Sequence, residues 1–167
     1  MSLEEIRAEF IRYEERRDKL KLLYIELTAA RDMLGQMASP GPGMYSLLTI
    51  ESETLDRLLV DVFSLIHEDA LLVKLLINLR TQFRVIGTKQ RMFFSQMSLP
   101  LSGKDVTTVQ HNAWIAEKAT STNPTISLAL KLLEDRFKLR NPLEDPRFQE
   151  EIDKLIASLK PQADSRQ

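Results

Sequence analysis

Apolar side chains recur at alternating spacings of three and four residues over the first 37 residues of the chain, without a break for five heptads. Because an α-helix has about 3.6 residues per turn, this spacing places them on one seam of a single helix. The pattern predicts one helix over residues 2–37, about 50 Å long at about 1.5 Å per residue. Ser2 and Glu5 form a capping-box pattern at its start. The seam positions are Leu3, Ile6, Phe10, Tyr13, Arg17, Leu20, Tyr24, Leu27, Arg31 and Leu34.

Residues 49–97 are predicted to form two helices joined by a hinge. Ser52 is a suitable cap for a short helix that ends at about Val60, and His67-Glu68-Asp69 offers cap candidates for a second helix over residues 68–97. The alternative is one helix that runs straight through His67 and separates the acidic and basic halves of this region. The second helix carries a stripe expected to be buried, made of Leu72, Leu75, Leu76, Leu79, Phe83, Ile86, Phe93 and Met97.

Prolines divide the C-terminal part of the chain into three predicted helices. The first covers residues 105–119, and Asn123 with the following proline is expected to start the second, over 124–139. The third covers residues 146–159, and its expected inward face is Phe148, Ile152, Leu155 and Leu159.

These elements predict an all-α fold, a helical bundle with two long antiparallel helices and several shorter C-terminal helices. The two long helices, 2–37 and 68–97, are expected to pack against each other, while the shorter helices close the core. We expect a single helical domain over residues 1–160 and a disordered tail over 161–167.

Composition excludes several classes of protein. The chain has no cysteine, which excludes a disulfide framework or a cysteine nucleophile and suits a reducing compartment. A formal net charge of −1 over 167 residues gives no global field that attracts nucleic acid. No apolar run approaches the roughly 20 residues needed to cross a bilayer, so a cytoplasmic location is expected.

The local charge is less even than the total. Residues 51–69 carry six acids against Arg57 alone, and residues 70–104 carry six basic residues and no acid. In one interpretation the two segments pack together and neutralise each other. In the other, the basic segment faces an acidic protein, an anionic lipid or a nucleic acid. The candidate residues for that role are Arg80, Arg84, Lys89 and Arg91.

Catalytic and metal-binding patterns are missing from the sequence. His67 and His111 are the only histidines, and neither has the spacing of a metal-ligand motif. His67 is assigned to a helix start and His111 to a solvated helix face. We therefore predict no enzyme, no cofactor and no metal site, and infer no small-molecule substrate.

Three further residues are candidates for partner binding. Arg17 and Arg31 occupy seam positions where apolar residues are expected. They either lie at the edge of the bundle with buried stems, fix the register of a self-associating coiled coil, or bind anionic groups. Phe94 follows Phe93 directly, and two consecutive side chains on a helix cannot face the same core line, so Phe94 is a candidate contact for a partner.

The expected function is a non-catalytic helical interaction or regulatory domain that associates with a protein partner or with itself through the first helix. The alternative is a binder of anionic lipid or nucleic acid through residues 74–104. The layout of long helix, loop, short helix and long helix is similar to cytoplasmic domains of bacterial membrane-anchored proteins. That resemblance implies a place on the cytoplasmic face of a membrane, within a longer chain. Met1-Ser2-Leu3 resembles a cloning leader, as expected for an excised domain.

Overall fold

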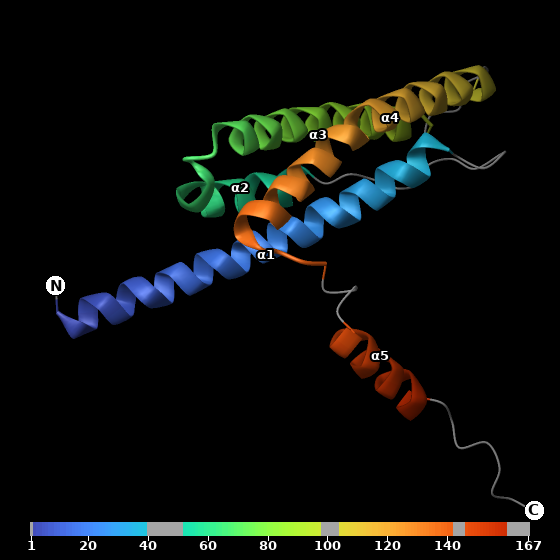
Figure 1. Ribbon diagram of the computed structural model, residues 1–167. Coiled ribbons are helices and arrows are strands. Elements are labelled where there is room, and N and C mark those ends of the chain that lie inside the picture. The colour runs from blue at the N-terminus through green and yellow to red at the C-terminus, as the bar shows by residue number, and fades with distance from the viewer. Residues whose placement is uncertain (1, 40–51, 98–103, 142–145, 160–167) are drawn as a thin grey trace, which may run out of the picture.

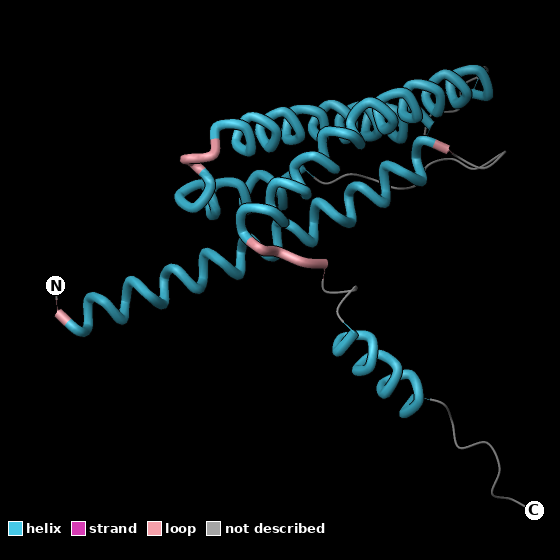
Figure 2. The backbone as a smooth tube through the Cα atoms, in the orientation of Figure 1, coloured by secondary structure: helices cyan, strands magenta, loops and turns pink. Residues whose placement is uncertain are grey.

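The computed structural model describes residues 2–39, 52–97, 104–141 and 146–159. These residues form five α-helices and contain no strand (Figure 2). The predicted all-α class is therefore confirmed. The helices are α1 (Leu3–Ala38), α2 (Ser52–Ile66), α3 (Ala70–Met97), α4 (Lys104–Phe137) and α5 (Pro146–Leu159).

The first four helices form an up-down-up-down bundle. Each helix packs against two others, α1 on α2, α2 on α3, α3 on α4 and α4 on α1. In Figure 1, α1 and α3 run from left to right, while α2 and α4 run from right to left. Helices that are neighbours in this ring are thus antiparallel, as expected when successive helices pack side by side.

The predicted packing of residues 2–37 against residues 68–97 is wrong. Within the described part of the chain, α1 and α3 lie diagonally across the bundle, and their backbones do not pack side by side. Both instead pack on α4, which is 34 residues long and can cover the stripes of both. The sequence pattern did not indicate this arrangement, because it divides α4 at Pro124 into two shorter helices.

The core is formed by one apolar stripe from each helix of the bundle. Leucine, isoleucine, valine and alanine side chains dominate it, and each fully buried large side chain contributes roughly 1.5–3 kcal/mol. Side chains without any exposed surface are Leu23, Leu27, Leu34, Val62, Leu72, Leu79, Ala119, Ile126, Ala129 and Leu133.

α1 is longer than the bundle. Its predicted capping box is confirmed, because the Ser2 hydroxyl accepts a hydrogen bond from the Glu5 amide at 3.2 Å and the Glu5 carboxylate accepts one from the Ser2 amide at 2.6 Å. Among the side chains of this helix that the structure describes, burial begins only at Leu20. The part of the helix before Leu20 projects past the other helices toward its N-terminus (Figure 1), although Lys19 still pairs with Asp61 of α2 at 3.0 Å. We call residues 3–17, which come before this contact, the α1 extension; it is about 22 Å long at about 1.5 Å per residue.

The predicted hinge between α2 and α3 is confirmed, although α2 continues to Ile66 instead of ending at about Val60. The chain turns at His67 and Glu68. The Asp69 carboxylate then accepts a hydrogen bond from the Leu72 amide at 3.1 Å, which caps α3. The other carboxylate oxygen of Asp69 pairs with Arg136 at the end of α4. The alternative of one continuous helix is wrong.

The predicted break at Asn123-Pro124 is also wrong, because α4 continues through Pro124. A proline inside a helix costs about 3 kcal/mol relative to alanine. Here the buried stripe continues on both sides of it in one register, with Ala119, Thr122 and Ile126 all buried, while Pro124 itself is exposed. Burial of this continuous stripe against α1 and α3 outweighs the local penalty.

The last predicted helix exists, with Pro146 at its first position, but its predicted inward face does not close the core. α5 contacts none of the other helices in the described part of the chain, and Leu155 and Ile156 are exposed. Helical periodicity identifies an apolar face without showing what covers it. The predicted tail at 161–167 lies outside the described residues, and the single domain over 1–160 stays a prediction.

Candidate interaction surfaces

The α1 extension carries an uncovered continuation of the bundle's own seam. Ile6, Phe10 and Tyr13 are 49%, 63% and 50% exposed, whereas Leu20 and Leu27, further along the same seam, are 1% and 0% exposed. The expectation that the start of helix one projects beyond the core is met for Ile6 and Phe10. A helix that covers no other part of the bundle has no need of an apolar seam, so this surface is a candidate interface.

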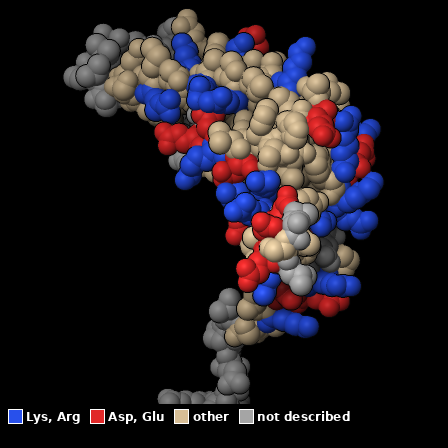
Figure 3. Space-filling view, turned by 90° about the vertical axis from the view of Figure 1, so that its left-hand side faces the viewer, with Lys and Arg blue, Asp and Glu red and all other residues tan. Residues whose placement is uncertain are grey.

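Charged side chains of both signs surround that seam. Arg7, Glu9 and Arg16 are exposed beside it, and Glu14 is half-buried. Figure 3 looks onto this end of the molecule and shows Lys and Arg interspersed with Asp and Glu, without a large area of one sign. The surroundings of the seam are therefore suited to a partner that also carries both signs.

The predicted basic cluster on α3 is partly neutralised by α2. One carboxylate oxygen of Asp56 accepts a hydrogen bond from Arg80 at 2.5 Å, and the other accepts one from Arg84 at 2.5 Å. Burial acts to raise the pKa of Asp56, but the hydrogen bonds and charges of Arg84 and Arg80 outweigh it and lower that pKa. Of the two interpretations of the charge pattern, these contacts support mutual neutralisation of neighbouring segments.

The other two cations of this cluster lie in different surroundings. Lys89 turns toward α4, where its ammonium lies 5.8 Å from the centre of the Trp114 ring. Arg91 is exposed, and its guanidinium lies 3.3 Å from the Thr88 hydroxyl. Lys89 is thus separated from Arg80, Arg84 and Arg91, whose spacing of four and seven residues keeps them on one face of α3.

The remaining candidates are also separated. Arg17 lies exposed on the α1 extension, whereas Arg31 is half-buried at the edge of the bundle, with its Nε 3.4 Å from an Asp32 carboxylate oxygen. Phe94 is half-buried and meets Phe93 edge-on, with ring centres 5.7 Å apart. Only Arg17 belongs to the uncovered seam.

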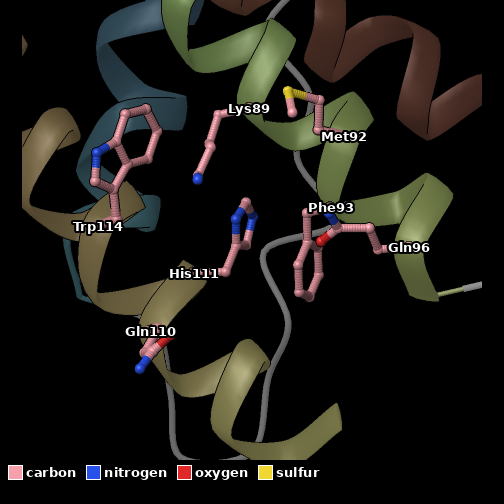
Figure 4. Close-up of a pocket in the computed structure, with 7 residues that line it drawn as sticks. All are labelled: Lys89, Met92, Phe93, Gln96, Gln110, His111 and Trp114. Atoms are coloured by element: carbon pink, nitrogen blue, oxygen red, sulfur yellow. The ribbon is translucent and has the colours of Figure 1, made fainter. Parts of the chain in front are cut away.

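A pocket of about 270 Å³ lies between the C-terminal part of α3 and the N-terminal part of α4 (Figure 4). His111 lies against Phe93 there, with ring centres 3.9 Å apart and planes within 2°, and Figure 4 shows Lys89 pointing between Trp114 and His111. The described residues that line it are Lys89, Met92, Phe93, Gln96, Gln110, His111 and Trp114.

The assignment of His111 to a solvated helix face is wrong, because this side chain is only 6% exposed. Burial and the nearby charge of Lys89 lower the pKa of His111 and favour the neutral imidazole. Its position four residues before Ile115 and eight before Ala119 places it on the buried stripe of α4. That spacing was the available signal in the sequence.

Among the described residues, the lining of this pocket offers an ammonium, an imidazole and two amides, and no carboxylate or hydroxyl. Nowhere in the described ranges do three or more His, Cys, Asp or Glu side chains come together in a way that could hold a metal ion. None of the described helices combines the length and apolarity needed to span a membrane.

A second apolar surface lies between α2 and α3. Val60, Phe63 and Ile77 are 77%, 54% and 55% exposed along a groove of about 360 Å³. Asp56 and Arg80, which pair with each other, also line this groove. The described residues that line this groove all belong to α2 and α3, so it is separate from the seam of the α1 extension.

Comparisons with protein-family models, curated proteins and solved structures found no match. The geometry of these surfaces is therefore the basis for assigning a function.

Proposed function

We propose that this protein is a non-catalytic helical interaction domain that associates, with itself or with another protein helix, through the α1 extension. The observation that carries this proposal is the continuity of one apolar seam. From Leu20 onward, the side chains of this seam build the core. Before Leu20, the seam continues with Ile6, Phe10 and Tyr13, and no described helix covers these three side chains.

Burial of these side chains supplies a driving force for association. Each large apolar side chain that leaves water on binding contributes roughly 1.5–3 kcal/mol when its burial is complete, and aromatic residues are enriched where interfaces gain most of their energy. Phe10 and Tyr13, three residues apart, form such a pair on one face of the helix. The rigid bundle fixes the direction of the helix that presents them.

The alternative, binding of anionic lipid or nucleic acid through residues 74–104, has less support. Arg80 and Arg84 share the carboxylate of Asp56, and Lys89 lies against Trp114. We keep a cytoplasmic location, including the cytoplasmic face of a membrane, as part of the proposal. Its support is the absence of cysteine from the chain.

Sedimentation velocity of the intact chain over a wide concentration range tests association through the α1 extension. We expect the weight-average mass to rise with concentration, and the double variant Ile6→Glu/Phe10→Glu to remain a monomer. Val109→Glu is the matched control, because Val109 is 68% exposed on a different helix and its replacement should leave association unchanged. Circular dichroism should show equal helicity in all three proteins. If the double variant sediments like the unaltered chain at every concentration, self-association does not use this surface.

A further inference from the structure

We infer that the partner of the α1 extension is a second copy of this chain, paired antiparallel, with Ile6 opposite Arg17 of the second copy and Phe10 opposite Tyr13 of the second copy. This inference rests on the proposed function and specifies its partner and geometry.

The uncovered part of the seam matches itself in this register. Its described positions are Ile6, Phe10, Tyr13 and Arg17, all exposed, and burial starts at the next position, Leu20. In an antiparallel coiled coil the two kinds of seam position face each other across the interface. The register therefore gives each uncovered seam residue an uncovered partner. The aromatic residues meet at the centre, and the stem of Arg17 covers Ile6 of the second copy at each end.

The shape of the molecule favours the antiparallel direction. From Leu20 onward the seam of α1 is covered by the other helices of the bundle. In a parallel pair, two bundles would occupy the same side of the seam at the same level and collide. In the antiparallel pair, the bundles lie at opposite ends of the paired helices, because each α1 extension points away from its own bundle (Figure 1).

The flanking charges favour the same direction. In the antiparallel register, Arg7 faces Glu14 of the second copy and Glu9 faces Arg16 of the second copy, and two-fold symmetry produces each pair twice. In a parallel pair, Glu9 would face Glu14, and Arg16 would face Lys21. Flanking charges of this kind set partner choice and orientation in coiled coils. These flanking pairs are opposite in sign in the antiparallel pair and like in sign in the parallel pair.

Glu14→Arg distinguishes antiparallel from parallel pairing. The substitution should increase the dissociation constant of an antiparallel dimer and decrease that of a parallel dimer. In the antiparallel dimer the variant places Arg7 opposite the introduced arginine of the second copy, twice by symmetry, and we expect the dissociation constant to increase about tenfold. The double variant Arg7→Glu/Glu14→Arg restores opposite charges and should return the constant to that of the unaltered chain. Tighter association of Glu14→Arg would overturn the inference, since only the parallel pair gains from that change.

Disulfide formation provides a second, independent readout. The chain has no cysteine, so Ile6→Cys and Arg17→Cys each introduce a single thiol. Oxidation of an equimolar mixture should give disulfides between the two variants, because positions 6 and 17 face each other. Disulfides within each variant, position 6 to 6 and 17 to 17, would show parallel pairing and contradict the inference. They would still leave association through the α1 extension intact.

Two further outcomes separate this inference from competing partners. A chain that stays monomeric at every concentration contradicts self-pairing, while the proposed function survives if a different protein helix binds the seam. The other uncovered apolar helix, α5, is tested with Leu155→Glu/Ile156→Glu in the full chain. Both residues are exposed, and we expect this variant to dimerise normally. Loss of dimerisation in it would assign the interface to α5 and overturn the inference.

Discussion

Replacing Pro124 with alanine should stabilise the bundle, although no side-chain packing is added. Pro124 lies inside α4 on its exposed side. Proline has no amide hydrogen, so the carbonyl of Thr120, four residues earlier, has no helical donor, and the ring pushes against that carbonyl. The Pro124→Ala variant restores both the donor and the space in the middle of a helix that packs on α1 and α3.

The expected gain is the difference between two effects. Alanine is favoured over proline by about 3 kcal/mol inside a helix. Alanine also gives the unfolded chain more conformations, and this stabilisation of the unfolded state offsets about 0.4–1 kcal/mol of the gain in the helix. The net stabilisation is therefore about 2 kcal/mol. For a chain of this size this corresponds to a rise in Tm of roughly 4–8 °C.

Thermal and urea denaturation followed by far-UV circular dichroism measure this difference. Lys131→Ala is the control, because Lys131 is exposed on the same helix and both residues favour helices, so its effect should stay within about 0.5 kcal/mol. An unchanged or lower Tm for Pro124→Ala would refute the reasoning. It would mean that the packing of α4 depends on the local geometry that proline imposes.

Three further predictions concern the core and its ionisable groups. Leu27→Ala should lower the free energy of unfolding, measured by urea titration, by about 2–5 kcal/mol, because Leu27 is 0% exposed. The control Leu22→Ala, on the exposed side of α1, should change it by less than about 0.5 kcal/mol. Asp56→Asn should cost about 1 kcal/mol at neutral pH. This contribution is present above the ordinary pKa of 3.8 and is lost as the pH falls through the lowered pKa of Asp56, so the two proteins should converge in acid. The pKa of His111 is lowered in the folded state, so the unfolded state takes up a proton first as the pH falls below 6.5, and Tm should decrease there. His111→Phe should remove that part of the pH dependence. An unchanged profile of Tm against pH in this variant would contradict the prediction.

Features set by short stretches of sequence could be predicted. The heptad spacing and the Ser2 capping box gave α1 its length to within a residue at either end. Asp69 identified the start of α3. A carboxylate at this position can accept a hydrogen bond from a free amide of the first helical turn, and this contact needs no distant part of the chain. The projection of Phe10 followed from the length of the helix alone.

Features set by distant partners could not be predicted. Pro124 satisfies every local rule for a helix start, and only burial of the whole stripe against two other helices overrides that preference. The stripes of α1 and α3 are both leucine-rich, so either could pack on any long helix, and sequence alone did not distinguish a diagonal pair from an adjacent one. The sharing of Asp56 between Arg80 and Arg84 depends on the offset between α2 and α3. Charge balance indicated neutralisation but not which carboxylate provides it.

The even number of antiparallel helices in the bundle determines how it responds to mechanical force. The last helix of the bundle returns to the end where the first one enters, and the hydrogen bond of 2.6 Å from the Tyr24 hydroxyl to Glu134 near the end of α4 joins them there. Tension applied through the α1 extension and through the chain after α4 therefore acts on the same end of both helices. It separates α1 from α4 one turn at a time, beginning at this hydrogen bond, instead of shearing the whole contact at once. The bundle should therefore yield at low force when pulled through its two chain ends, whatever its stability against heat.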